Sequence, residues 1–136
     1  MSQNNIELAR QGYAAFMRGD IPGLLELMSD DIQWVLHSPA EAEPAGGEHK
    51  GKAAVADWFR TLGQHYEFEV FSPDEFIASG DKVVVLGHET TRAKSTGRRG
   101  EFEWVHVFTY RQGKLARFDA FFDSYSNAQL WKPMAM

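Results

Sequence analysis

Cysteine is absent from the chain of 136 residues. Its absence excludes disulfides, thiolate catalysis and zinc sites built on cysteine ligands. Long apolar runs are also absent: none approaches the roughly eighteen residues of a membrane-spanning helix. The N-terminal stretch MSQNNIELAR lacks the apolar segment of a secretory signal. We therefore expect a cytoplasmic protein without a membrane-spanning segment.

Positive charge is scarce. The formal net charge is −5, and the one basic cluster is the short, turn-like segment from Lys94 to Arg99, so nucleic acid is not an expected partner. No glycine-rich phosphate-binding loop is present. The histidines show no spacing typical of metal ligands; they are His37, His49, His65, His88 and His106. We expect no metal and no nucleotide or flavin cofactor.

Aromatic residues are abundant. They make up 13% of the chain, with ten Phe and four Trp, while the 43% hydrophobic and 24% charged residues are typical of an ordinary globular protein. The length fits a single domain over residues 1–136. In a small domain, this many aromatics form a large core, or some of them line a cavity or an interface.

The hydrophobic periodicity predicts three helices followed by a run of strands. Helices are predicted from about Ile6 to Gly19, after Asp20, and from Lys52 to Gln64. Strands are predicted at 31–37, 66–78, 82–93, 100–110 and 114–124. This order predicts an α+β fold whose helices pack on one face of a curved sheet and leave a cone. Residues 38–51, rich in Pro, Gly and Ala, are predicted to form a loop long enough to be a lid or rim.

The segment FEWVHVFTY, residues 102–110, places an imidazole in the middle of an aromatic strand face. With period two, that face carries Phe102, Trp104, His106, Phe108 and Tyr110. His106 is either a core histidine that donates to a backbone group, or the polar point of an apolar pocket. We favour the pocket.

The turn after this strand predicts its pairing with the last strand. A three-residue loop from Arg111 to Gly113 pairs Tyr110 with Lys114 and places His106 opposite Phe118. The even-numbered residues of both strands then share one face.

The hairpin before this strand leaves open which of two polar residues lies beside His106. A two-residue turn at its Thr-Gly pair places Glu89 opposite Trp104 and Gly87 opposite His106. A slip of one residue brings His88 to this face instead. We prefer Glu89, and a glycine opposite His106 would leave room for a ligand.

The remaining candidate site residues come from several elements. The predicted pocket wall consists of Trp34, Trp58, Phe59, Trp104, Phe118 and Phe122. His37, beside the long loop, is either a ligand contact at the mouth or a surface histidine. Asp119 and Asp123 fall on the outer face, where we expect a salt bridge with Arg117 or a dimer contact.

Four segments carry a resemblance to a known family: YAAFMRGD (13–20), MSDDIQW (28–34), GKAAVADWF (51–59) and TGRRGEFEWVHVFTYRQGKLARFDAFFDS (96–124). The chain resembles, over essentially its whole length, the SnoaL-like branch of the nuclear transport factor 2-like superfamily. That superfamily includes ketosteroid isomerases, polyketide cyclases and limonene epoxide hydrolase. The resemblance implies a cone-shaped α+β fold, in which a curved mixed or antiparallel sheet and three N-terminal helices enclose a hydrophobic pocket.

The resemblance carries over to the site only in part. His106 takes the position of the protonated aspartate in the isomerase oxyanion hole, and the isomerase's helix-one tyrosine falls nearest Gly12 or Tyr13. The general-base aspartate falls at Leu36 to Ser38, where the chain has no carboxylate, and the aspartate of the cyclases falls at or next to Ala120.

The expected function is the binding of a small, mostly apolar molecule, with cofactor-independent isomerase, cyclase or hydratase/dehydratase chemistry if turnover occurs. His106 would polarise an oxygen and Glu89 would move a proton. The alternative is a non-catalytic ligand-binding or dimeric interaction module, and a third interpretation is an accessory subunit whose sheet binds another protein. We also expect a homodimer through an outer sheet patch made of Val105, Val107, Leu115 and Phe121.

Overall fold

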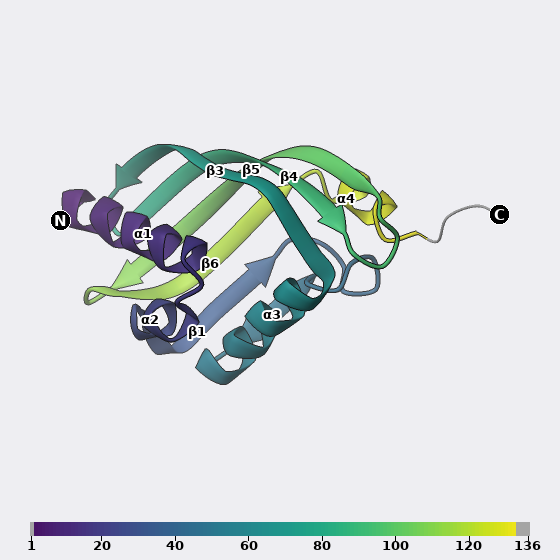
Figure 1. Ribbon diagram of the computed structural model, residues 1–136. Helices are drawn as coiled ribbons and strands as arrows, with labels where there is room; N and C mark the ends of the chain where they lie inside the picture. Colours follow the sequence, from purple (N-terminus) through teal and green to yellow (C-terminus); the bar gives the residue numbers. More distant parts are fainter. Residues whose placement is uncertain (1, 133–136) are drawn as a thin grey trace.

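The computed structural model describes residues 2–132 and confirms the α+β architecture (Figure 1). The helices are α1 (Ser2–Met17), α2 (Ile21–Glu26), α3 (Lys52–His65) and α4 (Ser124–Gln129). The strands are β1 (Met28–Leu36), β2 (Gly47–Lys50), β3 (Tyr66–Ser79), β4 (Lys82–Ala93), β5 (Arg99–Arg111) and β6 (Lys114–Phe122). None of the described helices is long and apolar enough to cross a membrane.

The strands form one mixed sheet in the order β2-β1-β6-β5-β4-β3. β1 and β6 are parallel, and the other neighbours are antiparallel. The sheet curves strongly, and α1, α2 and α3 lie on one side of it (Figure 1). The buried hydrophobic residues lie between these helices and the sheet. This arrangement is the predicted cone.

Local signals explain where α1 ends and where α2 begins. Gly19 has a φ of +76°, a conformation that glycine adopts without steric cost and that stops α1 as predicted. The Asp20 side chain then accepts a hydrogen bond from the backbone N–H of Gly23 at 2.9 Å, which caps α2.

Two elements were not predicted. The segment 38–51 contains β2, which pairs with β1, and α4 follows β6. Asp123 caps α4 because its carboxylate accepts the backbone N–H of Ser126 at 3.0 Å. The prediction extended the last strand through 124, two residues beyond its observed end at Phe122.

The predicted register of the last hairpin is wrong by two residues. Gln112 and Gly113 both have positive φ angles, 51° and 77°, so the turn has two residues rather than three. Ala116 then forms a bulge, which places His106 opposite Ala120 rather than Phe118. A shift of two preserves the face on which His106 lies.

Because of the bulge, one residue of the predicted outer patch lies on the inner face instead. Leu115 lies on the N-terminal side of the bulge, where the in-and-out alternation of β6 is reversed. Its side chain is only 4% exposed and belongs to the core. The outer patch therefore consists of Val105, Val107 and Phe121, of which Phe121 is exposed.

Candidate functional site

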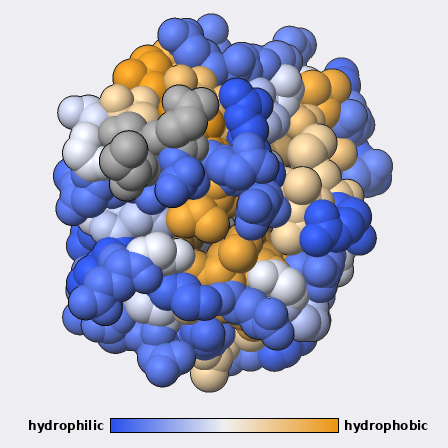
Figure 2. Space-filling model, turned by 90° about the vertical axis from the view of Figure 1, so that its left-hand side faces the viewer, coloured by the Kyte–Doolittle hydropathy of each residue, from blue (hydrophilic) through white to orange (hydrophobic). Residues whose placement is uncertain are grey.

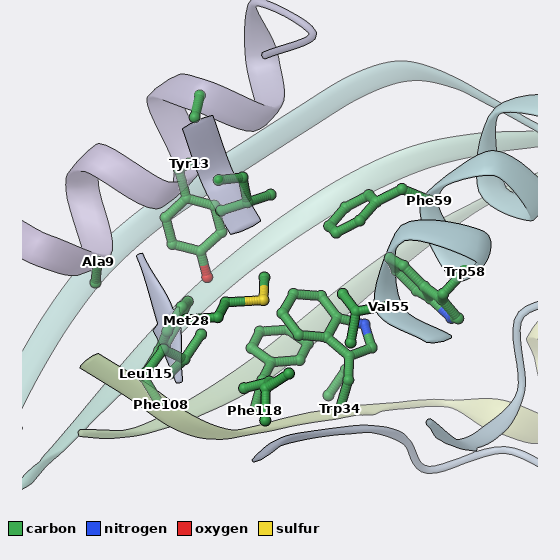
Figure 3. Close-up of a cluster of buried hydrophobic side chains, with 14 of the residues drawn as sticks. Ala9, Tyr13, Met28, Trp34, Val55, Trp58, Phe59, Phe108, Leu115 and Phe118 are labelled. Carbon is green, nitrogen blue, oxygen red and sulfur yellow. The ribbon is translucent and has the colours of Figure 1, made fainter. Parts of the chain in front are cut away.

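The core contains a cavity between the helices and the concave face of the sheet. The space open to the centre of a water molecule is about 110 Å³, roughly seven to eleven times what one water needs. On the side opposite α4, Figure 2 shows a hydrophobic hollow among mostly hydrophilic residues. In the close-up, Tyr13 reaches from α1 toward the sheet while Trp58 and Phe59 reach in from α3 (Figure 3).

Most of the predicted site residues line this cavity. They are Trp34, Trp58, Phe59, Glu89, Trp104, His106, Phe118 and Phe122. Several of the rings contact one another; Trp34 and Phe118, for example, stack with centroids 3.9 Å apart. The structure thus brings these side chains together around one cavity.

His37 lies elsewhere. Leu36 points into the cavity, so the next side chain along the strand direction points outward. The His37 Nε2 atom is 2.9 Å from Asp119 Oδ1, and its ring stacks on Phe121 at 4.1 Å. Asp119 also accepts a hydrogen bond from Arg117 Nε at 2.9 Å, which confirms the predicted outer position of this aspartate. His37 is therefore a surface histidine of the outer sheet face.

The first polar group of the cavity is a hydrogen-bonded pair, Tyr13 and His106. The Tyr13 hydroxyl lies 2.7 Å from His106 Nδ1, and the imidazole stacks on Trp104 at a centroid distance of 3.8 Å. Burial lowers the pKa of His106 to about 3, and burial raises the pKa of Tyr13. Both side chains are therefore uncharged near neutral pH.

This pair keeps one donor hydrogen for a third group. If the Tyr13 hydroxyl donates to Nδ1, the imidazole carries its hydrogen on Nε2; if Nδ1–H donates, the phenol hydrogen stays free. Among the described residues, neither side chain has a second hydrogen-bond partner. Both side chains line the cavity. In either tautomer, the pair offers a neutral donor to a ligand.

The sequence left Gly12 and Tyr13 open as the counterpart of the isomerase tyrosine. Both residues line the cavity, and only Tyr13 brings a hydroxyl to His106. The apolar spacing from Ala9 to Tyr13 places the tyrosine on the buried face of α1, and this periodicity is the signal that identifies it.

Glu89 is the second polar group, and it lies farther from His106 than predicted. The preferred face is correct, because Glu89 lines the cavity while His88 is exposed and contacts Asp74 at 2.6 Å. However, Glu89 pairs with Phe102. His106 is four residues farther along β5, a separation of about 13 Å along the strand.

The position of Gly87 accounts for part of this difference between the predicted and the observed register. It lies opposite Trp104 rather than His106. A Cβ atom at Gly87 would come within 2.3 Å of the Trp104 ring. The missing side chain therefore makes room for the indole, not for a ligand.

The environment of Glu89 favours its neutral form. The Thr91 hydroxyl donates to the Glu89 carboxyl group. Burial, opposed by this hydrogen bond and reinforced by the nearby Glu43, raises the pKa of Glu89 to about 7. Near neutral pH, Glu89 is thus able both to accept and to release a proton.

Glu43 was not predicted as a site residue. It lies in the loop before β2, is only 2% exposed and lines the cavity. The Tyr66 hydroxyl donates to Glu43 Oε1 at 2.5 Å and accepts the Ala45 N–H at 3.2 Å. Burial raises the pKa of Glu43 above its ordinary value. A glutamate in a loop rich in Pro and Ala gives no signal of burial in the sequence.

The cavity thus has two polar regions. The Tyr13–His106 pair forms one of them, midway along the lining residues of β5, and we call Glu43, Tyr66 and Glu89 the acidic end. Within residues 2–132, no three His, Cys, Asp or Glu side chains are grouped as metal ligands.

Comparisons with known proteins agree with this fold. The family model described as SnoaL-like domain matches residues 9–118. An NTF2-like protein from Burkholderia xenovorans LB400 is 32% identical, with 97% of this chain and 98% of that chain covered and a TM-score of 0.89. An NTF2-like protein of unknown function from Burkholderia pseudomallei K96243 is 34% identical, with 96% and 98% covered and a TM-score of 0.86.

A third solved structure contains an organic ligand. It is TerC co-crystallised with polyporic acid, 30% identical, with 93% of this chain and 97% of that chain covered and a TM-score of 0.83. A search of curated proteins found no match.

Proposed function

The chain belongs to the SnoaL-like domain family, and we propose that its cavity binds a small, mostly apolar organic molecule and acts on it by cofactor-independent acid/base chemistry. The observation that carries this proposal is the contact of 2.7 Å between the Tyr13 hydroxyl and His106 Nδ1. It is a neutral donor pair on an otherwise aromatic wall. The co-crystal of TerC with polyporic acid supports an organic ligand.

The proposed chemistry is of the isomerase, cyclase or hydratase/dehydratase type. The donor of the Tyr13–His106 pair polarises a carbonyl or hydroxyl oxygen of the ligand, which stabilises negative charge as it develops there. Glu89 accepts or returns a proton, because its pKa of about 7 suits general base catalysis near neutral pH. Since the two polar regions are about 13 Å apart along the strand, Glu89 reaches only a proton at the far end of the ligand.

That separation also favours a second candidate, ligand binding without turnover. A carbon acid requires its base within hydrogen-bond reach of the proton that is removed. A compact ligand held at Tyr13 and His106 does not bring the same carbon to Glu89. In this alternative, the two polar regions orient a ligand and no bond changes.

Hydrogen exchange at carbon separates the two candidates. The protein is incubated in D₂O with extended conjugated ketones, such as 6-methyl-3,5-heptadien-2-one, and deuterium uptake at the conjugated methyl groups farthest from the carbonyl is followed by NMR. We expect catalysed uptake with the natural chain. The double variant Tyr13→Phe, His106→Phe should lose about 10²- to 10³-fold of it, as expected when neutral donors to a developing oxyanion are removed.

Glu89→Gln should also abolish the catalysed uptake, whereas Glu103→Gln, at an exposed carboxylate of β5, should leave it unchanged. Ketones that bind without any catalysed uptake would favour the binding-only function.

A further inference from the structure

We propose that the acidic end of the cavity is a subsite for a protonated amine, so that the ligand is an elongated aromatic molecule with an oxygen at one end and a basic nitrogen at the other. This inference rests on the proposed function in one respect, that the cavity binds an organic ligand. It adds the chemical class of that ligand.

The charges around the cavity point to a cationic ligand group. Two carboxyl groups line it, Glu43 and Glu89, and no lysine or arginine is among the lining residues of the described chain. A carboxylate in an apolar cavity is stabilised when a cation joins it. An anionic ligand group would meet like charge there. The acidic end therefore favours an ammonium group over a hydroxyl, and a hydroxyl over a carboxylate.

Glu89 has no structural role that explains its position. Glu43 accepts the Tyr66 hydroxyl, and Tyr66 in turn accepts the Ala45 N–H. These contacts anchor the loop to β3. Among the described residues, Glu89 receives a hydrogen bond only from the hydroxyl of Thr91, two residues along its own strand, and this bond joins no separate elements. Its carboxyl group remains available to a ligand in the cavity.

A metal ion is a poorer match than an amine. Divalent cations take several oxygen ligands, and no group of three or more candidate ligands exists among residues 2–132. An ammonium group has three N–H donors, and acceptors for them are the Glu89 carboxyl group and Glu43 Oε2, which is buried and has no hydrogen-bond partner among the described residues. The aromatic side chains that line this end, Phe68 and Phe102, also suit a cation beside a ring face.

The register fixes the shape of the ligand. Glu89 pairs with Phe102, and His106 lies four residues farther along β5, about 13 Å along the strand. A ligand that contacts both polar regions therefore carries its two polar groups on opposite ends of an aromatic body. A phenol with an aminoalkyl chain in the para position has this form.

Matched probes test the subsite directly. Tyramine, tyrosol and 4-hydroxyphenylacetate share one phenol and differ only in a terminal amine, alcohol or carboxylate; homologues with one more carbon extend the reach. Affinities are measured by calorimetry at pH 8, where Glu89 is mostly ionised. We expect the amine of at least one series to bind tenfold or more tightly than the alcohol, and the carboxylate to bind least.

Variants test whether Glu89 causes the preference for the amine. Glu89→Gln keeps an acceptor for the Thr91 hydroxyl and should reduce the preference for amine over alcohol to less than threefold. Glu103→Gln, exposed on β5, should leave it unchanged. If the Gln variant does not fold, the natural chain alone decides, because the amine should bind with proton release at pH 6.5 and the alcohol without it. Proton release appears as a dependence of the binding heat on the ionisation heat of the buffer.

Proton release between pH 6 and 8 comes from the carboxyl groups of the cavity. Burial raises the pKa of each tyrosine that lines it and lowers that of His106 to about 3. Lining residues of α3 and β6 are apolar, and α4 contributes Asn127. The titratable side chains that line the cavity are Tyr13 on α1, Glu43 in the loop, Tyr66 on β3, Glu89 on β4, and His106 and Tyr110 on β5.

The outcomes separate this inference from the proposed function. Equal binding of amine and alcohol, binding of the carboxylate alone, or binding of none of the probes up to millimolar concentration would overturn the amine subsite. Catalysed deuterium uptake by ketones would then still support acid/base catalysis. Conversely, amine-selective binding without any uptake would retain the subsite and reject turnover.

Discussion

Replacing Glu89 by Gln makes the stability of the folded chain less dependent on pH. Glutamine has nearly the same shape and still accepts the Thr91 hydroxyl, but it does not ionise. The pKa of the Glu89 carboxyl group rises from its ordinary value of 4.5 to about 7 in the folded chain, chiefly through burial. The difference reports how strongly the folded state disfavours the carboxylate.

The direction in which stability changes with pH follows from the linkage between proton binding and folding. Because the folded pKa lies above the unfolded one, the contribution of Glu89 to stability is fully present below pH 4.5 and is lost as the pH rises through 7. A shift of this size corresponds to about 3 kcal/mol. The natural chain should therefore lose up to about 3 kcal/mol between pH 4.5 and pH 8 through this group. Glu89→Gln should lose none of it.

Urea unfolding at several pH values measures this difference. Relative to the natural chain, Glu89→Gln should have a similar free energy of unfolding at pH 4.5 and a higher one, by about 2 to 3 kcal/mol, at pH 8. Glu103→Gln, whose side chain is exposed, serves as the control and should follow the natural chain at each pH. A Glu89→Gln variant that is less stable at pH 8, or equally shifted at all pH values, would refute the burial of a proton-binding carboxyl group.

Two further predictions concern the donor pair and the outer sheet face. Tyr13→Phe and His106→Phe should each cost about 1 to 3 kcal/mol of unfolding free energy, because each leaves a buried partner unpaired. The double variant should cost clearly less than the sum, and additive losses in urea unfolding would show that the contact of 2.7 Å contributes nothing. For association, Phe121 is 43% exposed on the outer sheet face, and we propose a homodimer through this face. Sedimentation should show dimers at micromolar concentration and a shift toward monomer in Phe121→Glu; a natural chain that is only monomeric would contradict it.

The fold was predictable because its signals are local and agree with one another. Gly19 and Asp20 mark the boundary between α1 and α2. Alternation of apolar residues marks β5, where Trp104, His106 and Phe108 are buried. These signals depend on neighbours in the sequence, so they can be recognised without knowledge of the tertiary structure.

The predicted elements failed where the deciding interaction is not local. β2 exists because β1 offers it a partner, and nothing in the segment GEHK itself indicates a strand. Glu43 is buried because Tyr66, 23 residues away, donates to it. A polar residue in a loop is normally exposed, so its burial could not be predicted from its own surroundings.

The two hairpin registers decide what the site can do. Both were predicted with the correct face and an error of two residues, so the same side chains enter the cavity except for Leu115, which lies beyond the bulge and was predicted to point outward. A shift of two residues changes spacing by about 7 Å along a strand, and spacing is what determines chemistry. In the predicted register, Glu89 lay opposite Trp104, one inward position from His106, close enough for both to serve one reacting centre. In the observed register, Glu89 lies opposite Phe102, and the two groups contact opposite ends of a ligand.

Most of the strand residues that line the cavity therefore follow from alternation, whereas their positions relative to one another across the strands depend on features that the sequence alone does not reveal. One is the turn residue Gln112, whose positive φ of 51° is unusual for a residue with a side chain. The other is the packing of Trp104 against Gly87, which fixes the register between β4 and β5. Each is a choice between registers that present the same face, and only the tertiary structure distinguishes them.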